Sequence, residues 1–208
     1  MKKKPSSFDR RDFMLLSAGA ATAAVGLQSP QAEAAASDYG IVGQMAPDLK
    51  LDYWIDKDGK ESSFSVFENK GKWIFLKCFQ SWCPGCHSSG FPTLKAFADE
   101  FWDHPKVAIA GIQTVFEGFG TNSLSQVRKL QLRYDLPITM GHDAGDPEGV
   151  RHPQTMRKYR TGGTPWLILI HPSGRVVYNG FHADKDKLIS YIQEQLDKAE
   201  VKEKSSAT

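Results

Sequence analysis

Residues 73–86 read WIFLKCFQSWCPGC, an apolar run that leads directly into two cysteines separated by two residues. A continuous apolar run of this length, bounded by polar residues, predicts a buried strand over residues 72–79. Two thiols at this spacing can close a small disulfide and reopen it, because the second thiol can attack a mixed disulfide that the first has formed. The order of strand and CxxC motif therefore indicates thiol–disulfide exchange chemistry at the end of a sheet strand.

The rest of the chain alternates strand patterns with helix patterns. An Asp-Gly turn at residues 56–60 joins apolar segments at 51–55 and 62–66, which predicts an N-terminal β-hairpin. After the motif, apolar residues at helical spacing predict a helix that begins at Cys83 and is kinked at Pro92. Further strands are expected at residues 107–115, 137–140, 166–170 and 176–178, and further helices at 125–134, 154–159 and 184–199. This order predicts an α/β fold, a three-layer sandwich with a mixed central sheet flanked by helices.

The first 36 residues have the composition of an export signal. Lysines and arginines come first, an apolar run over residues 13–27 is too short to span a bilayer, and small residues at 32–36 offer a cleavage site. The pair Arg10-Arg11 is typical of twin-arginine signals, although Asp9 stands where such signals prefer Ser or Thr, so the general export route stays open. We therefore expect cleavage near residues 34–36 and a periplasmic mature protein; the alternative is an uncleaved amphipathic anchor.

Charge and cysteine content limit the classes of partner. The 208 residues include 26 Lys and Arg against 24 Asp and Glu; five of the basic and three of the acidic residues lie in the first 36, which leaves 21 of each. This balance predicts no nucleic-acid or membrane-surface partner. We expect one monomeric domain over residues 37–200 and a disordered tail over 201–208. Three cysteines are too few for a disulfide scaffold, and Cys78, inside the predicted strand, is expected to be a buried, inert thiol.

Three features together resemble the TlpA/ResA-type exported thiol–disulfide oxidoreductases of the thioredoxin-like superfamily, which have a redoxin domain. They are the WCPGC motif at residues 82–86 after a strand, the Thr164-Pro165 pair before a strand, and the closing hairpin and helix. The resemblance extends over almost all of the predicted domain and implies the thioredoxin-like sandwich. It also implies that Cys83 is the exposed nucleophile at a helix N-terminus, whose partial positive charge favours the thiolate. Cys86 is then the buried resolving thiol.

The same resemblance assigns the neighbouring residues. Pro165 is expected to be cis and to face the sulfurs, and because it has no N–H, the extended backbone at Thr164 can pair with a substrate strand. Trp82 is expected to cover one side of the site, and Pro84 and Gly85 to shape the turn around the sulfur. Protein disulfides and thiols would be the substrates, with a membrane-bound electron relay as redox partner and no bound cofactor or metal. Reduction of disulfides is the expected direction, and oxidation is the alternative.

Four features depart from the family pattern. Lys77 stands where thioredoxins have a buried acidic residue, six positions before the first cysteine. It is either a lysine beneath the disulfide, able to stabilise a thiolate or to lose its own proton, or an edge lysine whose amine reaches solvent. Ser89 replaces a frequent glutamate, and the segment from the second cysteine to Pro92 is one residue longer than usual. Loops at residues 116–122 and 141–153 match no general thioredoxin element.

Two other functions remain open. A peroxiredoxin shares the fold but needs Thr or Ser three residues, and Pro seven residues, before its reactive cysteine; before Cys83 these positions hold Gln80 and Leu76. A copper-binding or metal-delivery protein would use two thiolates and a histidine, a ligand set that suits Cu(I). The histidines available for it come late in the chain, at His142, His152, His171 and His182. A structural zinc site is not expected, because the sequence has no second ligand pair at zinc spacing. His87, directly after the motif, either adds charge beside the cysteines or faces solvent.

Overall fold

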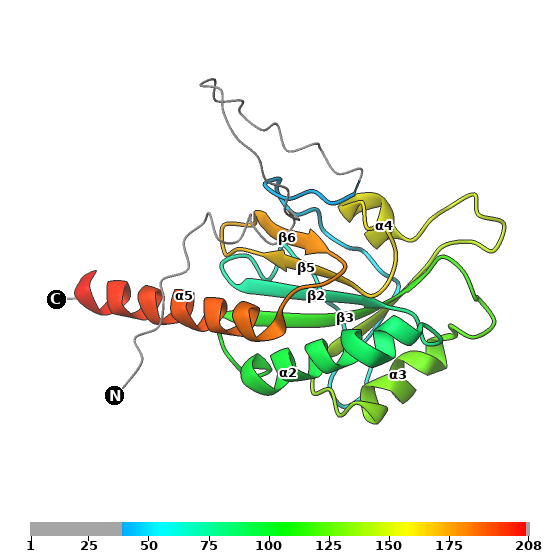
Figure 1. Cartoon of the computed structure of the whole chain (residues 1–208), viewed down its shortest axis with the longest axis horizontal. Helices are drawn as coiled ribbons and strands as arrows, with labels where there is room; N and C mark the ends of the chain where they lie inside the picture. The colour runs from blue at the N-terminus through cyan, green and yellow to red at the C-terminus, as the bar shows by residue number, and fades with distance from the viewer. Residues whose placement is uncertain (1–38, 207–208) are drawn as a thin grey trace, which may run out of the picture. The chain divides into compact units, whose positions relative to one another are not determined.

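The computed structural model describes residues 39–206, so the predicted export signal lies outside the described residues. A six-stranded sheet forms its centre, in the order β1–β4–β3–β2–β5–β6 (Figure 1). The strands are β1 (Tyr53–Ile55), β2 (Trp73–Phe79), β3 (Val107–Val115), β4 (Thr139–Ala144), β5 (Trp166–Ile170) and β6 (Val176–Gly180). β2, β3 and β4 are parallel, whereas β1, β5 and β6 each pair antiparallel with their neighbours, so the predicted mixed sheet is confirmed.

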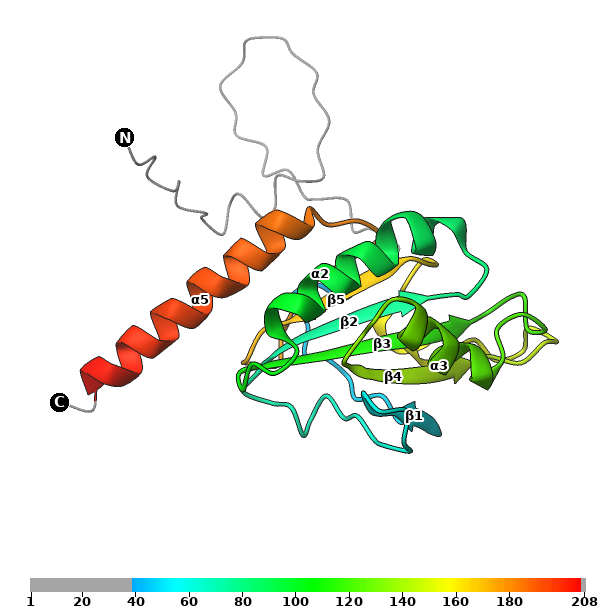
Figure 2. The same cartoon turned by 90° about the horizontal axis from the view of Figure 1, so that it is seen from below.

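Helices cover both faces of this sheet, which makes three layers. They are the π-helix η2 (Cys86–Gly90), α2 (Phe91–Phe101), α3 (Leu124–Arg133), α4 (Gln154–Tyr159) and α5 (Lys185–Ser206). α2, α3 and α5 lie on one side of the sheet and α4 on the other (Figures 1 and 2). Two buried apolar clusters fill the spaces between the layers, one around Phe75 and Phe97 and the other around Leu76 and Ile168. Successive residues of β2 alternate between the two clusters, as expected for a strand covered on both faces.

The predicted N-terminal hairpin is only partly formed. The turn at residues 56–60 closes with a backbone hydrogen bond of 2.9 Å, and a single bridge joins the end of β1 to Glu61. Residues 62–66 do not continue as a strand, and β1 pairs with β4 instead. The physical reason is burial: Phe64 and Val66 turn inward and pack in the cluster beneath α4, which stabilises them more than an exposed hairpin arm would.

The last helix is longer than predicted. We expected it over residues 184–199 with a disordered tail over 201–208, whereas α5 continues to Ser206. An ion pair between Lys106 Nζ and the Glu203 carboxylate, 2.8 Å long, joins the extension to the domain. The prediction of a tail is therefore wrong for the described part of this segment. Among residues 39–206, no helix combines the length and the apolar composition that a bilayer crossing requires.

A buried carboxylate fixes α4 to the sheet. Asp143, on β4 and 4% exposed, accepts hydrogen bonds from the backbone N–H groups of Gln154 (2.8 Å) and Thr155 (2.6 Å) and from the Thr155 hydroxyl (2.5 Å). Asp143→Ala should lower the free energy of unfolding by about 3 kcal/mol, because these donors lose their acceptor and the helix loses its cap. Urea unfolding measures the loss. The control Asp146→Ala removes one bond in an exposed loop and should lose about 1 kcal/mol or less; equal losses would contradict the special role of Asp143.

Candidate active site

The two motif cysteines lie at the carboxyl end of β2, where the chain turns into η2. Cys83 is 7% exposed and Cys86 is 0% exposed, so the predicted exposed nucleophile is reachable only at its edge. The Cys86 N–H donates to the Cys83 sulfur at 3.2 Å, and the N–H groups of Cys86 and His87 donate to the Cys83 carbonyl at 3.1 and 3.2 Å. Cys83 therefore precedes the first helical turn, which contains Pro84 and Gly85. An N–H directed at the sulfur at a helix start favours negative charge there.

The three thiols differ in their surroundings. Burial, and after it the hydrogen bond with Cys83, raises the pKa of Cys86 to about 12. Burial also raises the pKa of Cys78 to about 12, and this side chain lies in the cluster on the opposite face of the sheet. Cys83 is also buried but keeps a small exposed edge, and its thiol donates to the Thr164 carbonyl at 3.6 Å. This difference favours Cys83 over Cys86 as the attacking thiol and leaves Cys78 a buried core residue, as predicted.

Thr164 and Pro165 lie beside the motif, immediately before β5. The peptide bond between them is cis, as predicted. Two glycines of the adjacent helical turns face the proline ring: a Cβ at Gly85 would lie 3.2 Å from Pro165 Cδ, and one at Gly90 would lie 3.0 Å from Pro165 Cβ. The missing side chains at these glycines let the helix approach the proline closely. This approach brings the Thr164 carbonyl next to the sulfur of Cys83.

The extra residue after the second cysteine is accommodated by the helix geometry. Hydrogen bonding is π-helical over Cys86–Gly90, and the ordinary α-helix begins only at Phe91. Because a π turn contains one more residue than an α turn, this segment matches the longer spacing. Pro92 then lies in the first turn of α2, where its missing N–H is tolerated. The irregularity therefore precedes Pro92 instead of occurring at it, and the Ser89 hydroxyl donates to the Gly85 carbonyl within it at 3.0 Å.

Lys77 is not an edge residue. It lies in β2, which has β3 on one side and β5 on the other, and it is 3% exposed. A Cβ placed at Gly90 would be 3.6 Å from Lys77 Cε and 3.7 Å from Cys86 Cβ, so the lysine side chain ends close to the second cysteine. Burial lowers the pKa of Lys77 to about 8, an effect that Cys78 and Cys86 partly oppose. The prediction of a lysine beneath the cysteine pair is confirmed, and the edge alternative is wrong.

The glycine-rich loop at residues 116–122 packs against Trp82. Gly118 has a φ of +60°, and a Cβ there would lie 2.6 Å from Trp82 Nε1, so glycine is needed for this contact. The indole N–H donates to Gln80 Oε1 at 3.0 Å, and the Asn122 amide donates to the same oxygen at 3.0 Å. Trp82 remains 45% exposed next to the motif. A loop that matched no general thioredoxin element therefore lies at the cysteine site.

Sequence reasoning missed a set of hydrogen bonds that holds the motif in place. The Ser81 N–H donates to Asn122 Oδ1 at 2.7 Å, and the Ser81 hydroxyl donates to the Thr121 carbonyl at 2.7 Å. His87 connects the Ser81 carbonyl, 2.7 Å from Nε2, with the Tyr134 hydroxyl, 2.6 Å from Nδ1. His87 is therefore a structural link between the motif and the end of α3, and of the two alternatives left open for it, the solvent-facing one is wrong. Ser, Asn and His are common in loops, so no local signal marked these residues.

Two of the four histidines considered for a copper site make contacts elsewhere in the domain. His142 hydrogen-bonds with Gln113 at 3.3 Å, and burial lowers its pKa. His171 packs edge-on against Trp73 at the amino end of β2, with ring centroids 4.8 Å apart. Within residues 39–206, no group of three or more His, Cys, Asp or Glu side chains is placed to hold a metal ion. The described part of the chain therefore offers no ligand set for the copper alternative.

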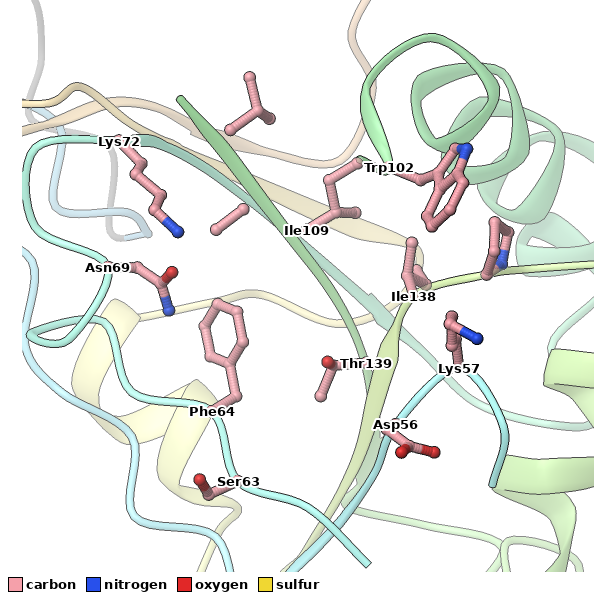
Figure 3. Close-up of a pocket in the computed structure, with 13 residues that line it drawn as sticks. Asp56, Lys57, Ser63, Phe64, Asn69, Lys72, Trp102, Ile109, Ile138 and Thr139 are labelled. Carbon is pink, nitrogen blue, oxygen red and sulfur yellow. The ribbon is translucent and has the colours of Figure 1, made fainter. Parts of the chain in front are cut away.

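A pocket of about 380 Å³ lies away from the cysteines, at the amino ends of β3 and β4 (Figure 3). Its lining includes the rings of Phe64 and Trp102 and the charged groups of Asp56, Lys57 and Lys72. The cysteines follow the carboxyl end of β2, so the separation is roughly 20 Å, the length of a seven-residue strand. This pocket therefore belongs to a different part of the domain from the cysteine site.

Known proteins share this fold. A family model described as the AhpC/TSA family matches residues 42–179. Among solved structures, a thioredoxin-like superfamily protein is 28% identical with a TM-score of 0.63, over 73% of this chain and 95% of that one. A thiol-disulfide isomerase from Corynebacterium glutamicum is 28% identical with a TM-score of 0.60, over 73% and 96% of the two chains. The thioredoxin domain of a thiol-disulfide oxidoreductase from Bacteroides vulgatus is 20% identical and shares the fold, with a TM-score of 0.54 over 74% and 96%.

None of the curated proteins compared with the chain matches it. The solved structures nevertheless confirm the thioredoxin-like fold expected from the CxxC motif and the Thr164-Pro165 pair. Because the family model extends over more than half of the chain, the protein belongs to the AhpC/TSA family.

Proposed function

We propose that this protein is a periplasmic thiol–disulfide oxidoreductase that reduces disulfides of exported proteins by exchange through Cys83 and Cys86. One observation carries the proposal. Cys83, whose sulfur accepts the Cys86 N–H, keeps 7% of its surface exposed, whereas the second thiol, Cys86, is fully buried. The similarity to a thiol-disulfide isomerase supports the same class of reaction.

The exchange runs in two steps. The Cys83 thiolate attacks one sulfur of a substrate disulfide, so that a Cys83–substrate disulfide forms and the other substrate sulfur leaves as a thiolate. Cys86 then loses its proton and attacks the Cys83 sulfur, which forms the Cys83–Cys86 disulfide and releases the second substrate thiolate. Two electrons pass from the cysteine pair to the substrate, and the released thiolates take up protons from solvent.

The substrate side of the site is formed by the segment before β5. The Thr164 carbonyl lies 3.6 Å from the Cys83 sulfur, so an extended substrate segment that pairs with this backbone would bring its own sulfur within reach of Cys83. Trp82 and Phe181, which are 45% and 41% exposed, offer apolar surface near the two ends of the site. Phe181 lies next to the Thr164 segment, because a Cβ placed at the preceding residue, Gly163, would lie 3.4 Å from the Phe181 ring.

Compartment and electron supply complete the proposal. The charged, apolar and small-residue segments of the first 36 residues support export to an oxidising compartment. A reductase there has to be re-reduced, and for this step we propose a membrane-bound electron relay. Cell fractionation of the full chain tests the location, and a protein found entirely in the cytoplasm would exclude it.

The geometry of the site favours neither of the two alternatives. Gln80 stands where a peroxiredoxin has a hydroxyl, and its side-chain oxygen Oε1 accepts hydrogen bonds from Trp82 and Asn122. The copper alternative needs a third ligand beside the thiols, and the described residues provide none in a suitable group.

Cys86→Ser tests the exchange mechanism. The variant should stop after the first step, because serine cannot attack the mixed disulfide, and a covalent Cys83–substrate species should accumulate. Non-reducing electrophoresis of the variant with a disulfide substrate detects it, and the double variant Cys83→Ser, Cys86→Ser should give none. If Cys86→Ser turns over at the wild-type rate and no covalent species accumulates, the mechanism is wrong.

A further inference from the structure

Lys77 occupies an unusual place for an amine. In the sheet it lies opposite Gly111 of β3 and Leu167 of β5, which carry no charge. Its side chain lies on the same face of β2 as Phe75 and Phe79, the face that α2 covers (Figure 2). With only 3% of its surface exposed, Lys77 has lost most of the water that would stabilise an ammonium group.

The far end of this side chain meets the cysteine motif. The Cβ position at Gly90 lies 3.0 Å from Pro165 Cβ, 3.6 Å from Lys77 Cε and 3.7 Å from Cys86 Cβ. Atoms of Pro165, Lys77 and Cys86 therefore surround one point, at the place where η2 crosses β2. Among the described residues, Lys77 is the lysine that reaches the site from within the core.

Among residues 39–206, no acidic side chain pairs with Lys77. None of the ion pairs in the described part of the chain includes it. The titratable groups that act on it are thiols, Cys86 from η2 and Cys78 from its own strand. A counter-charge for the ammonium therefore arises only when the cysteine pair itself carries a negative charge.

We propose that Lys77 is the buried cation that stabilises the thiolate form of the reduced Cys83–Cys86 pair and thereby raises the reduction potential of the couple. The disulfide is neutral. Its reduction adds two electrons and one proton, which gives one thiolate and one thiol, and only this product attracts the ammonium. Lys77 is a tuning residue and need not contact the substrate. This inference rests on the proposed function and refines it.

The consequence concerns the substrate class. A cysteine pair with a higher reduction potential is easier for the electron relay to reduce, and it is a weaker reductant toward substrates. Structural disulfides of secreted proteins resist reduction, whereas strained or exposed disulfides have higher potentials. The couple tuned by Lys77 is therefore suited to strained or exposed disulfides of its partner proteins.

The test is the redox equilibrium of the purified full chain with glutathione at pH 7. Lys77→Met keeps the length of the side chain and removes its charge. It should shift the equilibrium at least tenfold toward the Cys83–Cys86 disulfide, which corresponds to about 30 mV. Lys72→Met makes the same change just before β2, roughly 16 Å away along the strand, and should shift the equilibrium less than twofold. Alkylation of Cys83 by iodoacetamide at pH 7 should be slower in Lys77→Met and unchanged in Lys72→Met.

The dependence on pH separates charge from packing. Burial lowers the pKa of Lys77 to about 8, so the amine is mostly charged at pH 7 and loses its charge as the pH rises. The difference in redox equilibrium between the wild type and Lys77→Met should therefore become smaller above pH 8. A difference caused by packing would not change with pH. Lys77→Gln provides a second neutral variant if the methionine variant does not fold.

Two different failures can be told apart. If the wild-type pair does not equilibrate with glutathione, the proposed function fails. If it does, and folded Lys77→Met or Lys77→Gln has the wild-type equilibrium, the tuning role of Lys77 alone is refuted. A shift of the redox equilibrium in Lys77→Met that stays the same above pH 8 would also refute the tuning role of Lys77.

Discussion

Cys83→Ser should abolish thiol–disulfide exchange, reducing it to the rate measured without protein. Cys83 is the thiol of the motif that retains exposure, and its sulfur accepts an N–H at the start of the helix. A serine hydroxyl is not ionised near neutral pH and cannot exchange with a disulfide, whereas Cys86 is fully buried behind it. Reduction of a model disulfide substrate, with glutathione as the electron source, measures the loss.

Cys78→Ala is the matched control for this prediction. Cys78 is fully buried on the other face of the sheet, and burial raises its pKa to about 12, so it takes no part in exchange. The variant should keep the wild-type rate while losing about 1 kcal/mol of stability through the small cavity it creates. Residual turnover in Cys83→Ser, or loss of turnover in a folded Cys78→Ala, would contradict the assignment of the attacking thiol.

Lys77→Met should raise the free energy of unfolding of the oxidised protein, in which the Cys83–Cys86 disulfide is neutral and cannot compensate the ammonium, by about 3 kcal/mol at pH 7. The pKa of Lys77 is lowered by burial from 10.5 to about 8, and each pKa unit corresponds to about 1.4 kcal/mol. Between these two pH values the unfolded chain binds the proton more tightly than the folded chain does, so the stability of the wild type rises with pH. Below pH 8 the penalty for the buried charge is fully present, and methionine removes it.

The pH profile makes this second prediction specific. The gain in the free energy of unfolding of Lys77→Met over the wild type should be largest below pH 8. It should shrink as the pH rises toward 10.5, because the wild-type amine is then neutral in the folded state. Urea unfolding at several pH values measures it, with Lys72→Met as a control that should show little change. A loss of stability in Lys77→Met at pH 7, or a gain that does not depend on pH, would show that Lys77 does not carry a buried charge.

The two effects expected for Lys77→Met have one physical cause. The amine destabilises the fold because burial removes its water, and it stabilises the thiolate because no other charge lies beside it. A residue that lowers stability while it tunes a reactive group is a known trade-off at functional sites. If Lys77→Met changes both the redox equilibrium and the free energy of unfolding as expected, the two results together support a buried, charged Lys77.

Errors of the sequence-based predictions occurred where distant contacts override local pattern. The arm at residues 62–66 has the apolar content of a strand, yet Phe64 and Val66 are buried on the sheet face and β1 pairs with β4. Pro92 marked an irregular helix, but the π-helical turn lies before it, where Gly90 packs on Pro165. Both outcomes depend on the fit between segments that lie far apart in the chain.

Local sequence patterns were enough to predict the fold class, the cysteine pair that we propose as the reacting pair, and the cis proline beside it. An apolar strand, a CxxC motif and a Thr-Pro pair are short patterns whose chemistry depends on neighbouring residues. Three contacts follow only from the folded chain: Lys77 lies beneath Cys86, the loop at residues 116–122 packs on Trp82, and His87 hydrogen-bonds with Tyr134. Each of these depends on contacts across the sheet or between loops, and a lysine, a glycine or a histidine has no local pattern that reveals whether such a contact forms.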